Sequence, residues 1–112
     1  MKNKINYSPQ SLNDLDEIWE YIFSELGSLQ AAENTINNIL DAIDLLQDFS
    51  QIGAPLSSIT DIESDYRFLV SNSYMVFYRV NGREVYIDRV LYSRRDYLRI
   101  LFPDLPQSED DK

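Results

Sequence analysis

The strongest constraint on the fold lies in residues 65–97, which read DYRFLVSNSYMVFYRVNGREVYIDRVLYSRRDY. Three runs rich in valine, isoleucine, tyrosine and phenylalanine occupy residues 66–71, 74–80 and 83–92. Such runs favour strands that are buried on at least one face. Asn81-Gly82 is a strong hairpin signal, because a type I′ turn requires positive φ at both of its central residues. The stretch therefore predicts an antiparallel meander of three strands.

Two amphipathic helices are predicted before these strands. Ser8-Pro9 marks a helix start, because a hydroxyl caps the first turn and proline is tolerated at the first helical position. Gly27-Ser28 ends the first helix and caps the second. Apolar residues recur at spacings of three and four. They are Leu12, Leu15, Trp19, Ile22 and Leu26 in the first helix, and Leu29, Ala32, Ile36, Ile39, Ile43 and Leu46 in the second. Because the link is short, the helices form an antiparallel hairpin.

The remaining segments complete an α+β fold. Residues 4–7 are a short first strand, and 49–64 are a loop with a short turn near Leu56. Residues 93–102 are either a short helix or an extended tail. The order β-α-α-β-β-β predicts a small antiparallel sheet with the helical hairpin packed on one face, leaving the other face for surplus arginines. We expect one domain, residues 1–102, followed by a flexible acidic tail, residues 103–112.

The composition excludes several kinds of chemistry. The chain has no cysteine and no histidine, so it has no thiolate nucleophile, no cysteine metal site and no imidazole base. With only three glycines it has no glycine-rich phosphate loop. We therefore expect no metal and no cofactor. No apolar run approaches the ~20 residues of a membrane helix, and the N-terminus lacks the apolar core of a signal peptide. A cytoplasmic protein is expected.

The net charge of −9 is unevenly distributed along the chain. Residues 1–64 carry two lysines and eleven acids, whereas residues 65–102 carry seven arginines and four acids. Residues 103–112 carry one lysine and four acids. An overall acidic protein disfavours a nucleic-acid partner, but the segregation allows a basic site on an acidic body.

Arg67, Arg79 and Arg89 lie on three successive predicted strands. Arginine is rarely buried without a partner, so on one face these residues form a cationic patch for a phosphate, a carboxylate or an acidic helix. The alternative is that they pair with acids of the same sheet, such as Asp65, Glu84 and Asp88.

A second group of basic residues follows the last strand. Arg94 and Arg95 precede Asp96, and Tyr97 and Arg99 lie just beyond. Loops next to a rigid frame commonly carry function. Basic residues interleaved with tyrosines suit base stacking and phosphate binding. The alternative is a solvated segment whose ion pairs contribute little.

Two pairs of acids share a face of the first helix. They are Asp14 with Glu17, and Asp16 with Glu20. Carboxylates at these spacings can share a metal or act as an acid/base pair. We favour the plainer interpretation, in which they form the solvated face of an amphipathic helix.

Several of these residues resemble a known family. The segments 66–69 (YRFL), 74–80 (YMVFYRV) and 85–96 (VYIDRVLYSRRD) are similar to the RelE/ParE superfamily of toxins from bacterial type II toxin–antitoxin systems. The ending Arg-Val-Leu-x-x-Arg-Arg-Asp is the most specific part of the resemblance, which spans residues 4–102 and includes the helical hairpin.

The resemblance implies two activities and one common partner. RelE-like members cut mRNA in the ribosome without a metal, by attack of the RNA 2′-hydroxyl on the adjacent phosphate. ParE-like members poison DNA gyrase instead. An antitoxin wraps and neutralises both kinds of toxin. The resemblance also implies that the complex binds operator DNA indirectly, through the antitoxin.

The chain departs from the family where many members have histidine, at Tyr92. A phenol with a pKa near 10 is a poor base at pH 7 unless its pKa falls by about three units, roughly 4 kcal/mol. This departure, together with the acidic body, favours a ParE-like gyrase poison. Arg94, Arg95, Tyr97 and Arg99 are then the candidate target-binding residues.

Two alternatives stay open. The first is a metal-independent endoribonuclease in which Arg67, Arg79 and Arg89 hold the phosphate. Tyr92 or Tyr97 then takes part in proton transfer. The second is an inactive interaction module of the same fold. Whether the protein is an enzyme is therefore left undecided.

Overall fold

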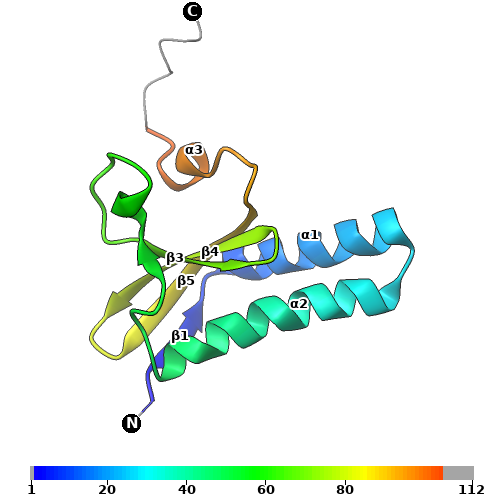
Figure 1. Ribbon diagram of the computed structural model, residues 1–112, viewed down its shortest axis with the longest axis horizontal. Helices are drawn as coiled ribbons and strands as arrows, with labels where there is room; N and C mark the ends of the chain where they lie inside the picture. The colour runs from blue at the N-terminus through cyan, green and yellow to red at the C-terminus, as the bar shows by residue number, and fades with distance from the viewer. Residues whose placement is uncertain (1, 105–112) are drawn as a thin grey trace, which may run out of the picture.

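A helical hairpin covers one face of a five-stranded sheet, and a short helix with a long loop covers the other (Figure 1). The computed structural model describes residues 2–104, so most of the predicted tail, 103–112, lies outside the described residues. The elements in chain order are β1 (Lys4–Tyr7), α1 (Pro9–Leu26), α2 (Leu29–Asp44), η1 (Leu45–Gln47), β2 (Ala54–Pro55), η2 (Leu56–Ser58), β3 (Arg67–Ser71), β4 (Tyr74–Asn81), β5 (Glu84–Tyr92) and α3 (Tyr97–Leu101).

The strands lie in the order β1-β5-β4-β3-β2. The predicted α+β class and the antiparallel β3-β4-β5 meander are confirmed. β1 pairs with β5 in parallel, so the sheet is mostly antiparallel. The strand β2 was not predicted, because it has only two residues, one of them a proline, inside a loop. It pairs with the start of β3.

The turn between β4 and β5 differs from the predicted type I′ turn. Asn81 and Glu84 are paired, so Gly82 and Arg83 are the central residues. Gly82 has φ +63°, and Asn72 is the only non-glycine residue with positive φ in the described chain. Positive φ at the first central position alone is the pattern of a type II′ turn, which requires glycine there.

Both helices start at the predicted serine caps. The Ser8 side chain accepts a hydrogen bond from the Ser11 N–H at 2.9 Å, and Ser28 accepts one from the Ala31 N–H at 3.1 Å. Gly27 ends α1 in the left-handed conformation. These contacts satisfy backbone groups that have no partner inside a helix.

The buried face of α1 differs from the predicted apolar seam. Leu15 and Ile18 are buried, but Leu12 is 51% exposed and Leu26 is 65% exposed, while Asp14 is buried. Leu26 lies near the tip of the hairpin, which extends past the sheet in Figure 1. The seam was misplaced because spacing alone does not show that a carboxylate faces the core.

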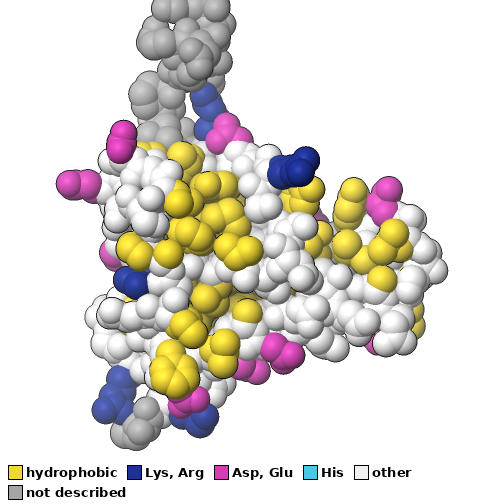
Figure 2. All heavy atoms as spheres, in the orientation of Figure 1, with side chains coloured by type: hydrophobic (Ala, Val, Ile, Leu, Met, Phe, Trp, Pro, Cys, Tyr) yellow, Lys and Arg dark blue, Asp and Glu magenta, His cyan; other side chains and the backbone are white. Residues whose placement is uncertain are grey.

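A second core occupies the sheet face opposite the hairpin. Phe77 and Leu91 are buried there, and Tyr97 and Phe102 pack against them. The segment 93–102 therefore contains a short helix, α3, and the expectation of a free face for arginines is wrong. Figure 2 shows apolar side chains exposed between the loop that carries η2 and the helical hairpin. Among the described residues, no helix has the length and apolarity needed to cross a membrane.

Candidate functional site

The three strand arginines do not form one patch. Arg67 is paired with Tyr78, whose ring lies in the core between the sheet and the helical hairpin. Arg79 and Arg89 lie on the opposite face of the sheet, the face that α3 covers, together with Phe77. Directly paired residues share a face and successive residues alternate, so Arg67 points away from the other two. The predicted cationic patch is therefore not present.

Arg67 holds the loop after α2 in place. Its Nε donates to the Gly53 carbonyl at 3.0 Å and its Nη2 donates to the Gln51 carbonyl at 3.1 Å. The Tyr78 hydroxyl accepts from the Gly53 N–H at 3.0 Å and donates to the Ser50 carbonyl at 2.9 Å. These contacts give Arg67 a structural role in this loop.

Arg79 is paired with acids of the sheet, as the alternative interpretation predicted. Its Nη2 lies 3.0 Å from Asp88 Oδ2, and its Nη1 lies 3.9 Å from Asp65 Oδ1. Its guanidinium carbon also lies 4.7 Å from the centroid of the Tyr66 ring. Burial, together with the nearby Asp88 carboxylate, raises the pKa of Tyr66 to about 12. Glu84 instead accepts from the Asn6 amide.

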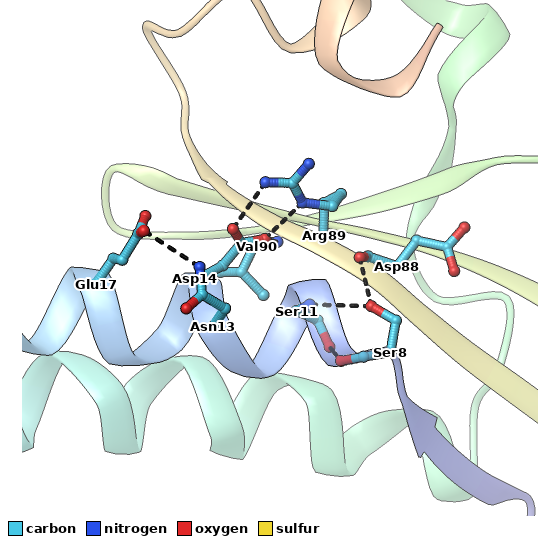
Figure 3. Close-up of polar contacts among 8 residues, drawn as sticks. All are labelled: Ser8, Ser11, Asn13, Asp14, Glu17, Asp88, Arg89 and Val90. Atoms are coloured by element: carbon cyan, nitrogen blue, oxygen red, sulfur yellow. Dashed lines mark hydrogen bonds and ion pairs between the residues drawn. The ribbon is translucent and has the colours of Figure 1, made fainter. Parts of the chain in front are cut away.

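Arg89 is bound by Asp14 of α1 (Figure 3). The two Asp14 oxygens accept from Arg89 Nε and Nη2, each at 2.8 Å. Asp14 Oδ2 also accepts from the Val90 N–H at 2.9 Å. The hydrogen bonds that Arg89 donates to Asp14 raise the pKa of Arg89 above the ordinary arginine value. Such a bidentate charged pair is among the strong polar contacts in proteins.

Asp14 lies where β1 stops covering the edge of β5. Ser8 follows β1, and its N–H donates to the Ile87 carbonyl and its hydroxyl to the Asp88 carbonyl. Beyond this point the outer edge of β5 faces α1 in place of a strand, and the Val90 N–H donates to the Asp14 carboxylate. The idea of a solvated pair with Glu17 is therefore wrong for Asp14. Within residues 2–104 no group of three or more potential metal ligands is present.

The basic group predicted after the last strand is partly exposed and partly packed against the core. Arg94 and Arg95 are exposed in the link after β5. Tyr97 instead packs on Phe77, with ring centroids 5.2 Å apart, and Arg99 pairs with Asp96 at 3.1 Å. The exposed part of this group is therefore the pair Arg94-Arg95.

Tyr92, at the end of β5, contacts an aromatic ring. Its ring meets Tyr74 edge-on at 5.8 Å, and it is 40% exposed. Burial, together with the neighbouring phenols of Tyr21 and Tyr92, raises the pKa of Tyr74. Because the three tyrosines come from α1, β4 and β5, their spacing in the sequence does not predict that they lie close together.

These tyrosines line an open groove of about 630 Å³. Its walls are α1, one residue of α2, the turn between β3 and β4, and the end of β5 with Arg95. The lining residues are Asp14, Glu17, Ile18, Tyr21, Ile22, Thr35, Asn72, Ser73, Tyr74, Val90, Tyr92 and Arg95. This groove was not predicted from the sequence.

Comparison with known proteins identifies relatives of this fold. The family model for the ParE toxin of the type II toxin–antitoxin system parDE matches residues 5–97. No match is found among curated proteins. The chain is similar to a structure of the chromosomal ParDE system from P. aeruginosa, with a TM-score of 0.68 and 22% identity over 80% of this chain and 95% of that chain. It is also similar to a structure of the RelBE2 toxin–antitoxin complex from Mycobacterium tuberculosis, with a TM-score of 0.50 and 16% identity over 82% of this chain and 92% of that chain.

Proposed function

The chain belongs to the ParE toxin family of type II toxin–antitoxin systems, and from this premise we propose that it arrests growth by poisoning DNA gyrase. The exposed pair Arg94-Arg95 is the proposed contact with the target. Within residues 2–104 neither side chain has an ion pair. The pair begins two residues after the end of the well-packed strand β5 and is therefore presented from a rigid frame.

The state of the strand arginines supports gyrase poisoning over RNA cleavage. A metal-independent nuclease needs cations that face the scissile phosphate and a group that accepts a proton. Arg89 is bound by Asp14, Arg79 by Asp88, and Arg67 by backbone carbonyls. Using them on a phosphate requires breaking contacts that stabilise the fold. Catalytic roles for these residues and for Tyr92 stay the alternative prediction.

Controlled induction of this chain alone tests the proposal. We expect growth arrest with filamentous cells and DNA damage, while primer extension on total RNA shows intact messages. Purified protein should also inhibit supercoiling by gyrase. New mRNA ends would support the ribonuclease instead, and unaffected growth would leave the inactive module.

The double variant Arg94→Ala/Arg95→Ala tests the contact itself. We expect it to lose growth inhibition and gyrase inhibition while its thermal unfolding stays unchanged. Arg83→Ala is the matched control, because Arg83 is also exposed but lies in the turn at the other end of β5. Equal activity of the double variant and the control would refute the role of Arg94-Arg95.

We also propose that a cognate antitoxin binds this chain and carries the complex to operator DNA. The two similar structures named above are described as toxin–antitoxin systems, which supports this partner. Co-expression with the product of the adjacent small reading frame should yield a stable complex. Recovery of the two proteins separately would count against the pairing.

A further inference from the structure

The arginine pair Arg94-Arg95 has no carboxylate partner within residues 2–104. Both side chains are exposed, and neither makes an ion pair with a described residue. The link that carries them is folded, because the Arg95 N–H donates to the Tyr92 carbonyl and the Tyr97 N–H donates to the Arg95 carbonyl. Guanidinium groups bind carboxylates through paired hydrogen bonds, so two adjacent arginines in a fixed link suit an acidic segment.

The described acids that adjoin this pair are in contact with other arginines. Asp96 pairs with Arg99 at 3.1 Å. Asp14 and Glu17 line the same groove as the second arginine of the pair, but Asp14 binds Arg89 at 2.8 Å. Contacts with Asp14 first, and then the charge of Glu17, raise the pKa of Arg89. The arginine pair therefore keeps positive charge that no ion pair of the described chain neutralises.

An acidic segment follows α3 in the sequence and lies outside the described residues. This acidic segment 109–111 consists of Glu109, Asp110 and Asp111. The helical hairpin repels it, because residues 9–44 contain eight acids and no lysine or arginine. The cations that attract the acidic segment therefore belong to the rest of the chain.

The length of chain after α3 lets the acidic segment reach the arginine pair. Figure 1 shows α3 between the link after β5 and the end of the described chain. The five residues of α3 form a helix about 8 Å long. The five residues from Asp104 to Glu109 span up to about 17 Å when extended. This span is about twice the length of α3, so the acids can lie back over α3 beside Arg95.

The other described cations without an ion pair lie at the far end of the sheet. Lys4 and Arg83 are neighbours there, because the Lys4 N–H donates to the Arg83 carbonyl. The nine residues of β5 separate them from the arginine pair by about 30 Å. Glu84 is paired directly with Lys4, so this end carries one uncompensated charge and the arginine pair carries two. The arginine pair is therefore the stronger site, and Arg83 serves as a reference.

We propose that the acidic segment 109–111 binds Arg94-Arg95 of the same chain and masks the contact with the target. The masking rests on the proposed function, whereas the contact itself does not. A segment tethered by a few residues has an effective concentration in the millimolar range, so weak surface ion pairs are enough to occupy the site. The tethered carboxylates compete with the acidic groups of a target for the same two guanidinium groups.

Modification of arginine by phenylglyoxal, followed by peptide mass spectrometry, tests the contact without any target. The probe is applied to the whole chain at low salt, in wild type and in Glu109→Gln/Asp110→Asn/Asp111→Asn. We expect Arg94 and Arg95 to react about threefold faster or more in this segment variant, because their carboxylate partners are lost. The difference should shrink in about 0.5 M sodium chloride, because salt screens exposed charges.

Two controls separate a local contact from a general effect of charge. Arg83 should react at the same rate in wild type and in the segment variant, and faster reaction there would overturn the proposal. The hairpin variant Asp16→Asn/Glu20→Gln/Glu25→Gln removes three exposed acids of α1 and changes the net charge equally. It should leave Arg94 and Arg95 as reactive as in wild type. Equal acceleration in both variants would show that only total charge matters and would refute the contact.

Inhibition of gyrase supercoiling tests the masking separately. We expect the segment variant to inhibit at about threefold lower concentration than wild type, while the hairpin variant matches wild type. If wild type does not inhibit gyrase, the proposed function fails, and the modification rates still decide whether the contact exists. If wild type inhibits but Arg94 and Arg95 react equally in wild type and segment variant, the proposed function stands and the contact is wrong. Faster modification with unchanged inhibition would refute the masking.

Discussion

Replacing Asp14 by alanine should destabilise the fold more than any other single loss of an acid in α1. The Asp14 side chain is 4% exposed and accepts three hydrogen bonds, two from Arg89 and one from the Val90 N–H. Its removal leaves a guanidinium with 26% exposure and a buried N–H without partners. Breaking a buried pair by deleting one member costs about 3–5 kcal/mol. Because Arg89 keeps partial contact with water, we expect the lower end, about 3 kcal/mol.

Urea denaturation followed by far-UV circular dichroism measures this loss as a change in the free energy of unfolding. Asp16→Ala is the control, because Asp16 is an exposed acid on the same helix and should change stability by only about 0.5 kcal/mol. Asp14→Asn keeps an acceptor for the Val90 N–H but loses the charge, so about 2 kcal/mol is expected.

A double variant tests whether the loss comes from leaving the Arg89 guanidinium without a partner. In Asp14→Ala/Arg89→Met the guanidinium is absent, so the combined loss should be smaller than the sum of the two single losses. The account is refuted if Asp14→Ala lies within about 1 kcal/mol of wild type, or if the two losses simply add.

Three further predictions concern the loop after α2 and the α3 side of the sheet. Gly53→Ala should cost about 2 kcal/mol and lower the thermal midpoint, because overpacking strains a tight site and the new Cβ would lie 2.6 Å from the Phe68 carbonyl oxygen; an unchanged midpoint contradicts this. Tyr78→Phe should also cost about 2 kcal/mol in urea denaturation, because it leaves the buried Gly53 N–H without its acceptor; wild-type stability would show that water replaces the hydroxyl. Tyr66 has its pKa raised from 10.0 to about 12, so the native state holds this proton more tightly than the unfolded chain and should lose stability as pH rises from 10 to 12. Tyr66→Phe should show a smaller loss over the same range, and identical pH profiles would refute the assignment.

The elements of the fold were predictable because they depend on local signals. The serine caps, the apolar spacing of the helices and the alternating strands each lie within a few residues of sequence. β2 escaped prediction because two residues with a proline carry no period, and the role of Gly53 depends on a close approach by Tyr78 from β4.

The site was less predictable because its contacts join distant residues. Asp14 and Arg89 are 75 residues apart, and α1 had to be oriented before Asp14 could be placed against β5. The arginines were correctly located on strands, but the bulge near Tyr78 and Asp88 and the position of α1 decide which of them meet acids. The groove needs residues from four elements and the turn between β3 and β4, so no single stretch predicts it.

The parallel pairing of β1 with β5 has a consequence for the order of folding. Ile5 pairs with Val85, so the first strand waits for a partner that is synthesised about 80 residues later. Contacts of such high sequence separation slow folding, because the chain between them must be ordered before the pairing is gained. A nascent chain on the ribosome therefore cannot close its sheet until β5 has emerged. The sheet therefore forms late in translation relative to the helical hairpin, which is complete by residue 44.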